Sequence, residues 1–220
     1  LGLTNFYFNF PQNVEAKEDE LIYESLSVFV MPQYTTPEDW DSEQPAVFVS
    51  LLGSLVNESD KPYLGEIRIP TFSSGSDVHF SLAGKFNDEG VSEELEATLD
   101  EKSNEIVWQV EDEIEPGEHY NIVVEYYFAF EHEDSSFEFS FPYQVERKAK
   151  IMDMLFFQPY NAEEFTVNGD IGEGVETNSF GITAHKFDLG EVQANTKYDI
   201  SISYMKNDMV TTLEAIETLI

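Results

Sequence analysis

Hydrophobic and polar residues alternate along much of the chain, and the longest such run begins at residue 120. Six apolar or aromatic residues hold one parity there: Tyr120, Ile122, Val124, Tyr126, Phe128 and Phe130. A half-buried β-strand is the simplest cause of a period of two. The same alternation recurs over 106–110 and over 137–143, where every second residue of the latter is aromatic. The pattern predicts a chain built from β-strands.

Shorter runs of the same kind predict the remaining strands. In the first part of the chain they fall at 1–13, 25–31, 47–56, 63–69 and 78–84, and in the second part at 151–157, 163–168, 179–187 and 197–205. Residues 91–99 suit a short helix or a strand, and we favour the strand. The tail at 210–220 is predicted as a short amphipathic helix or a frayed end, because Leu213, Ile216 and Ile220 share a helical face.

A long polar connection separates the second and third of these strands, between residues 32 and 45. Loops of this length are uncommon without a role. Trp40, flanked by Asp39 and Asp41, is either an exposed binding aromatic or a plug that folds back on the core. We favour the plug.

The alternation is interrupted by a turn at Pro116 and Gly117, residues that fix φ and tolerate positive φ respectively. With Ile114 before it and Tyr120 after it, the turn resembles the E–F corner of fibronectin type III and immunoglobulin-like domains. In those domains a tyrosine near the start of strand F hydrogen-bonds to the backbone upstream. The resemblance covers about a dozen residues, and it implies an architecture rather than an activity.

The corner pattern occurs a second time, with Val192, Asn195 and Tyr198 in step with Ile114, Gly117 and Tyr120. Asn is the next-best residue after Gly for a left-handed conformation. Any two hairpins that carry a tyrosine would look partly alike, but the register extends over six positions. We therefore predict an all-β chain of two tandem immunoglobulin/fibronectin III-like antiparallel β-sandwich domains. Their bounds are 1–146 and 147–209, followed by the tail 210–220, and the smaller domain is expected to lean on the larger one for burial.

The charge balance restricts the partners. The chain has 44 acidic and 11 basic residues and a formal net charge of −33. Repulsion disfavours nucleic acids and anionic membranes, whereas basic or cation-bridged protein partners suit this charge. The chain has no Cys, which excludes disulfides, thiolate metal sites and a Cys nucleophile. It has no apolar run of 18 residues, so we expect a soluble fragment outside the cytoplasm, at the cell surface or secreted, with any membrane anchor beyond it.

Catalytic signatures are missing from the sequence, including nucleophile-elbow, Walker, dinucleotide-binding and zinc-protease motifs. None of the four His residues has a second His at metal-ligand spacing. His132, between Glu131 and Glu133, is a candidate for a divalent-cation site, with a solvated loop as the alternative. We predict no catalytic residue and no organic cofactor.

Ca²⁺ is the one cofactor that the acidic loops suggest, because it takes several carboxylate and carbonyl oxygens. The best candidate ligands are Asn168, Asp170, Glu173 and Glu176, in a Gly-rich turn, and the weaker pair is Asp39 with Asp41. The alternative is that these acids are simply solvated. Asn57 begins the triplet Asn-Glu-Ser, which fits an N-glycosylation acceptor but is also frequent by chance.

These features together favour a non-catalytic extracytoplasmic spacer or protein-interaction module, with no prediction of oligomeric state. Two alternatives remain. A carbohydrate-binding module would use exposed aromatics, for which Tyr126 and Tyr127 on opposite faces are candidates. A Ca²⁺-dependent adhesion or surface-layer module would use the acidic turns.

Overall fold

The computed structural model describes residues 21–41, 44–72, 78–87, 90–179 and 181–218. The strand predicted over 1–13 lies outside these residues. Within them the chain forms strands β1 to β15 and one short helix, α1 (Thr212–Glu217). The prediction of an all-β chain is confirmed. No helix of the described part is long and apolar enough to cross a membrane.

The strands alternate with turns along the whole described chain. Those before residue 146 are β1 (Leu21–Pro32), β2 (Ala46–Asn57), β3 (Glu66–Pro70), β4 (Val78–Phe86), β5 (Ser92–Glu94), β6 (Thr98–Asp100), β7 (Glu105–Gln109), β8 (His119–Ala129), β9 (His132–Glu133) and β10 (Ser136–Gln144). Those after it are β11 (Ala149–Phe157), β12 (Glu163–Asn168), β13 (Val175–Ser179), β14 (Ile182–Val192) and β15 (Lys197–Met205).

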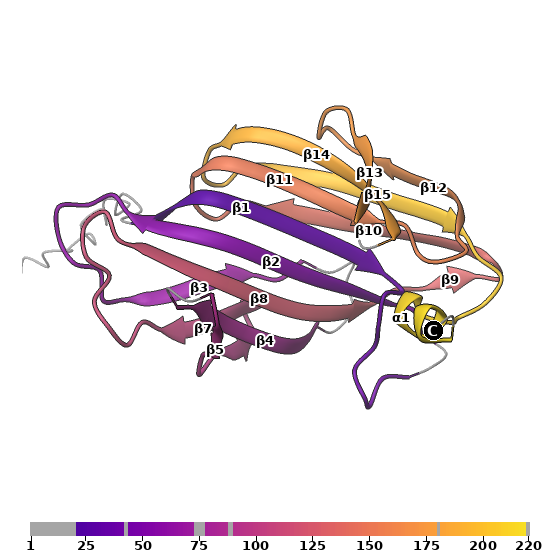
Figure 1. The fold of residues 1–220 in the computed structure, drawn as a ribbon, viewed down its shortest axis with the longest axis horizontal. Helices are drawn as coiled ribbons and strands as arrows, with labels where there is room; N and C mark the ends of the chain where they lie inside the picture. The colour runs from indigo at the N-terminus through magenta and orange to yellow at the C-terminus, as the bar shows by residue number, and fades with distance from the viewer. Residues whose placement is uncertain (1–20, 42–43, 73–77, 88–89, 180, 219–220) are drawn as a thin grey trace, which may run out of the picture.

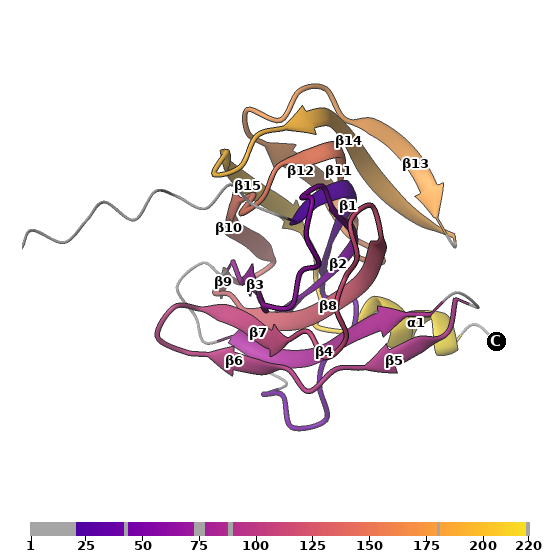
Figure 2. The ribbon, with the colours of Figure 1, turned by 90° about the vertical axis from the view of Figure 1, so that its left-hand side faces the viewer.

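The strands form three sheets (Figure 1). An eight-stranded sheet has the order β13-β14-β11-β1-β2-β8-β4-β5. A four-stranded sheet has the order β12-β15-β10-β9, and a three-stranded sheet has the order β3-β7-β6. Figure 2 shows the two smaller sheets at different places along the curved large one. One hydrophobic core receives side chains from all three sheets, which makes the fold compatible with a β-sandwich.

The alternating pattern of β10 shows why these residues form a half-buried strand. Phe137, Phe139, Phe141 and Tyr143 are buried, whereas the residues between them are exposed. Burying an aromatic side chain stabilises the fold by roughly 1.5–3 kcal/mol. A register slip of one residue would expose all four, so the pattern fixes the pairing of β10 with β15.

A second, smaller apolar cluster lies on the other face of the large sheet and includes Phe48 and Tyr127. Trp40 packs against this cluster, 6.4 Å from the Tyr127 ring, and its Nε1 donates to the Gln44 carbonyl at 2.8 Å. Trp40 therefore folds back onto an apolar cluster, as predicted, and is not an exposed binding aromatic. The chain end covers the same cluster with Ile216 of α1.

The C-terminal helix forms where the tail was predicted to be amphipathic. Thr211 and Glu214 make a capping box, in which each side chain accepts from the other residue's backbone N–H. The helix is tied to the loop after β1, because the Thr212 and Leu213 amides donate to the carbonyls of Gln33 and Tyr34 at 2.8 and 3.0 Å.

Two tandem domains are not confirmed, since strand pairing crosses the predicted boundary at 146/147. Strand β1 pairs in parallel with β11, with Leu26 opposite Met152 and Val30 opposite Phe156. Strand β10 pairs with β15 along its whole length. Sheets shared in this way give the two parts one common core. Local alternation predicts strands well, but it does not specify which strand lies beside which.

The doubled turn is present in the structure. Gly117 and Asn195 both have a positive φ, 80° and 64°. The Gly117 amide donates to the Asn57 carbonyl at 2.7 Å, and the Asn195 amide donates to the Val145 carbonyl at 2.7 Å. Each turn is also closed by a bond from its fourth residue to its first, from Glu118 to Glu115 and from Thr196 to Gln193.

The tyrosine part of the corner differs from the resemblance. Tyr120 lies in β8 opposite Leu55, and Tyr198 lies in β15 opposite Tyr143. Among the described residues, neither hydroxyl bonds to the backbone upstream of its turn, although Pro116 and Gly117 form the turn as predicted. The immunoglobulin/fibronectin III assignment is therefore not supported by the feature that suggested it.

Candidate functional site

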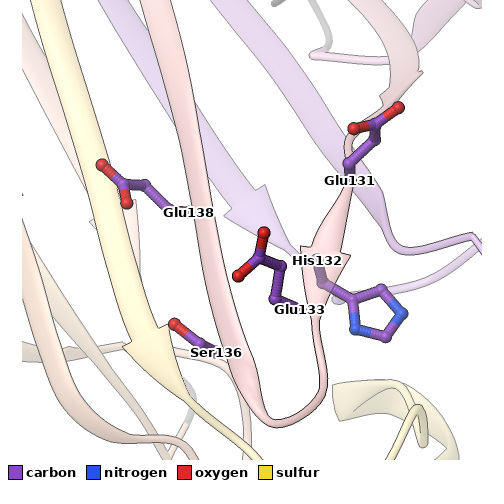
Figure 3. A pocket seen from close by; sticks show the side chains of 5 residues that line it. All are labelled: Glu131, His132, Glu133, Ser136 and Glu138. Carbon is purple, nitrogen blue, oxygen red and sulfur yellow. The ribbon is translucent and has the colours of Figure 1, made fainter.

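An acidic pocket of about 360 Å³ lies at one end of the four-stranded sheet (Figure 3). Its lining residues come from β9, from β10 and from the position before β9: Glu131, His132, Glu133, Ser136 and Glu138. The hairpin between the two strands turns at Asp134, which has a φ of 51°. Alternation in β10 places Ser136 and Glu138 on the solvent side, because Phe137 between them enters the core.

The carboxylates of this pocket do not converge. Figure 3 shows Glu131, Glu133 and Glu138 spread apart, with the His132 ring directed away from Glu138. The His132 ring stacks on Phe137 at 4.8 Å with an interplanar angle of 10°. Its Nδ1 lies 3.0 Å from the Asp134 carbonyl oxygen, which can only accept, so Nδ1 carries the proton. His132 thus has a structural position, and the predicted role as a cation ligand gains no support.

The four residues predicted to bind Ca²⁺ lie on strands of two different sheets and in the connection between them. Asn168 ends β12 in the four-stranded sheet, Glu176 lies in β13 of the eight-stranded sheet, and Asp170 and Glu173 lie in the connection. All four are exposed. In the part of the chain that the structure describes, no three His, Cys, Asp or Glu side chains are grouped so that they could hold a metal ion. Calcium binding here, and at Asp39 with Asp41, stays a prediction without a formed site.

Asn57 is a structural residue. It is fully buried, and its Nδ2 donates to the carbonyls of Lys61 and Ile114, both at 2.8 Å. Its Oδ1 accepts from the amide and the hydroxyl of Ser59. A side-chain amide with all of these partners inside the fold is inaccessible to glycosylation, so the triplet at 57–59 closes a loop instead.

The aromatic residues proposed for sugar binding are buried and in contact with other parts of the protein. Tyr126 is fully buried and its hydroxyl accepts from the Phe72 amide at 3.1 Å. Tyr127 is 8% exposed and stacks on Phe48 at 4.8 Å. Neither ring offers a flat exposed face, so the carbohydrate alternative loses the residues on which it rested.

A cluster of ionisable groups, which sequence reasoning missed, lies where the two parts of the chain meet. Tyr23 and Tyr143 are buried, and the side chains of Glu146 and Arg147 are 16% and 12% exposed. The Tyr23 hydroxyl donates to Glu146 at 2.5 Å, and Arg147 Nη1 lies 3.2 Å from the same carboxylate oxygen. Burial raises the pKa of the Glu146 carboxyl, and the charge of Arg147 opposes that rise. Burial likewise raises the pKa of Tyr143, whose hydroxyl has no hydrogen-bond partner in the described part of the chain. Glu146 and Arg147 follow the alternating strand β10, and nothing in the neighbouring sequence indicates that the fold would largely enclose them.

Comparison with known proteins gives a likeness of fold alone. No family model matches the chain, and no curated protein matches it. A solved structure of similar fold is the M1 zinc metallopeptidase from Deinococcus radiodurans, as its E323A mutant bound to a Tyr-Ser-Ala substrate. The TM-score is 0.51 and the identity 10%, over 83% of this chain and 42% of the metallopeptidase. The chain thus spans less than half the length of that protein.

This likeness corrects the predicted function. The expectation of a non-catalytic spacer or protein-interaction module followed from immunoglobulin-type sandwiches, and it is wrong. The fold is instead similar to part of a metallopeptidase. The predictions of an extracytoplasmic location and of a basic or cation-bridged partner stay predictions.

Proposed function

We propose that this chain is the β-domain of a peptidase-type protein and that it works beside a separate unit that carries the catalytic metal. The observation that carries the proposal is the fold: most of this chain superimposes on part of a zinc metallopeptidase. A fold by itself does not determine an activity. The proposed role is therefore also argued from the arrangement of possible metal ligands and from the strand pairing.

Ligand chemistry supports the proposal that the metal lies in another unit. Catalytic zinc sites take three protein ligands, usually His, Glu, Asp or Cys, and leave one position open. The described residues group no such set. In this proposal the β-domain therefore contributes a supporting surface and substrate contacts, while the metal-bearing unit supplies the bond-breaking chemistry.

The architecture suits a supporting role. Three sheets share one core, and the parallel pair β1–β11 and the antiparallel pair β10–β15 join the two parts of the chain. Shared strand pairing makes a stiffer platform than two units joined by a linker would. The metallopeptidase of similar fold is bound to a tripeptide, so we propose short peptides as substrates of the assembled protein.

The test uses the full-length product of the gene that encodes this chain. Its cleavage of Tyr-Ser-Ala is followed by mass spectrometry, with and without a zinc chelator. We expect cleavage that the chelator abolishes and zinc restores, and none with the 220-residue chain alone. Absence of both cleavage and peptide binding in the zinc-loaded full-length protein would reject the proposal, and so would equal cleavage by the isolated chain.

A further inference from the structure

The edges of the three sheets differ in how they are protected against pairing with another chain. An edge strand presents unpaired N–H and C=O groups, and proteins blunt such edges with short strands, Pro, bulges or charges. Three of the six edges described here are very short: β5 and β6 have three residues each and β9 has two. Strand β3 ends in Pro70. Strand β12 has a register shift after Glu163, with Glu164 at a φ of 53°.

The sixth edge, β13, has no Pro, no bulge and no Lys, and its one charged residue is Glu176. Its five residues pair with β14 without a register shift, and they include no Pro, Gly or Lys. Val175 at its start is 65% exposed. Within the described chain, β13 is the edge on which an additional strand meets the least obstruction.

The hydrogen bonds identify which groups of β13 face outward. The Thr183 carbonyl of β14 accepts from the Gln158 amide beside β11, so Thr183 directs its backbone groups away from β13. Asn178 is the partner of Thr183 across the pair. In an antiparallel pair such residues both turn their N–H and C=O outward, and the property alternates along the strand. The outward groups therefore belong to Asn178 and Glu176.

We propose that β13 accepts an extended, basic segment of a partner polypeptide as a ninth strand of the large sheet. Main-chain hydrogen bonds to Glu176 and Asn178 supply the pairing, as in other cases of strand addition. The inference goes beyond the proposed function and does not depend on it.

The negative charge of the chain favours a basic partner segment over a second copy of this chain at β13. Glu173 and Glu176 are both exposed at or beside the strand, and the formal net charge is −33. Two copies brought edge to edge would repel each other, whereas a segment rich in Lys or Arg would be attracted. Exposed Val175 offers an apolar contact, so a segment that alternates basic and β-branched residues fits best.

The test uses a fluorescent peptide of sequence Lys-Val-Lys-Val-Lys-Val-Lys, blocked at both ends, and measures its binding to the chain by anisotropy. Glu176→Pro removes one outward N–H without touching a bond to β14, because Pro is tolerated where an edge N–H faces solvent. Glu176→Gln is the matched control, since it removes the same charge and keeps the N–H. We expect Glu176→Pro to bind about tenfold more weakly than Glu176→Gln.

A second arm uses the wild-type chain, so it holds even where Glu176→Pro fails to fold. The same peptide with every internal backbone amide N-methylated keeps the charge and loses the N–H groups on both edges. We expect it to bind about tenfold more weakly and to leave amide exchange in β13 unprotected. Equal binding of the two peptides, or protection elsewhere than β13, would overturn the proposal. A peptide-free dimer that Glu176→Pro dissociates would also overturn it, in favour of a second copy.

Discussion

The Tyr23 hydroxyl donates a hydrogen bond of 2.5 Å to the Glu146 carboxylate, across 123 positions of sequence. Tyr23 lies in β1 and is 1% exposed, whereas Glu146 lies between β10 and β11. The Arg147 guanidinium shares the same carboxylate oxygen at 3.2 Å. This contact joins the two parts of the chain at the position where two separate domains would have met.

Removal of that donor is expected to destabilise the whole fold. Tyr23→Phe leaves the largely buried Glu146 carboxylate with one partner fewer, which costs about 1–3 kcal/mol. Urea unfolding followed by tryptophan fluorescence measures the loss. Tyr160→Phe is the control, because Tyr160 is 37% exposed and a surface change costs about 0.5 kcal/mol or less. Equal stability of the two variants would show that the bond contributes nothing.

The pH dependence of stability tests the state of Glu146. Burial raises its pKa in the folded protein, in spite of Arg147 and the Tyr23 hydrogen bond. A raised pKa stabilises the fold fully below the unfolded value, near about 4.3, and this contribution is lost as pH rises through the folded value. Glu146→Gln keeps the neutral form at every pH.

We therefore expect the stability of Glu146→Gln relative to wild type to increase as pH rises above about 4.3. The comparison is made by urea unfolding at several pH values up to 7. Glu125, whose pKa burial also raises, is present in both proteins and cancels from the difference. A difference that stays constant, or that falls with pH, would contradict the account.

At the positive-φ positions of the two turns, Gly117 and Asn195, Ala and Gly are expected to differ in their effect on stability. No atom lies within 4 Å of a Cβ added at Gly117, so the cost of Gly117→Ala is the backbone conformation alone, about 1–2 kcal/mol. Asn195→Gly relieves the same conformation, but it also loses the bond from Gln144 Nε2 at 3.2 Å. We expect Asn195→Ala to be less stable than Asn195→Gly in thermal melts. The reverse order would show that the positive φ carries no cost at this turn.

Asn57 predicts both a stability effect and an absent modification. Asn57→Ala removes the buried amide that donates to the Lys61 and Ile114 carbonyls and accepts from Ser59, at a cost of about 1–3 kcal/mol. The exposed Asn121 provides the control, because Asn121→Ala should cost about 0.5 kcal/mol or less. Protein made in a glycosylating host should be unmodified at Asn57 by mass spectrometry. A glycan on the natively folded chain would show that the buried position is wrong.

The dependence of the melting temperature on added cations distinguishes general charge screening from binding at a specific calcium site. Because a net charge of −33 repels itself, added salt should raise the melting temperature. The predicted ligands Asn168, Asp170, Glu173 and Glu176 are not gathered into a site, so CaCl₂ should stabilise no more than MgCl₂ at equal ionic strength. A calcium-specific rise that Asp170→Asn removes would instead establish binding at this turn.

The sequence predicts strands well wherever one face is buried. The parity of β10 is visible from its aromatic residues, and the turns at Gly117 and Asn195 have a chemical signature in the residues that tolerate positive φ. Strand β8 was predicted to be half-buried, but its central residues are buried on both faces. For the tail, the sequence predicts either a short amphipathic helix or a frayed end. The capping box of Thr211 and Glu214 shows that the helix forms.

Pairing between distant strands has no comparable signature. The parallel pair β1–β11 and the long antiparallel pair β10–β15 join segments far apart in the chain, and each strand would show the same alternation beside another neighbour. The cluster of Tyr23, Glu146 and Arg147 was missed for a related reason. Glu146 and Arg147 look like a polar boundary in the sequence, and only the tertiary structure encloses them beside Tyr23.

Amide hydrogen exchange tests the central claim, a single core shared by both parts of the chain, most directly. The measurement compares β1 (Leu21–Pro32) with β11 (Ala149–Phe157) over increasing urea. The account predicts that the central amides of both strands exchange with the same free energy and the same dependence on urea, because only global unfolding opens them. Exchange of β11 at a distinctly lower free energy than β1 would contradict it and restore two separate units.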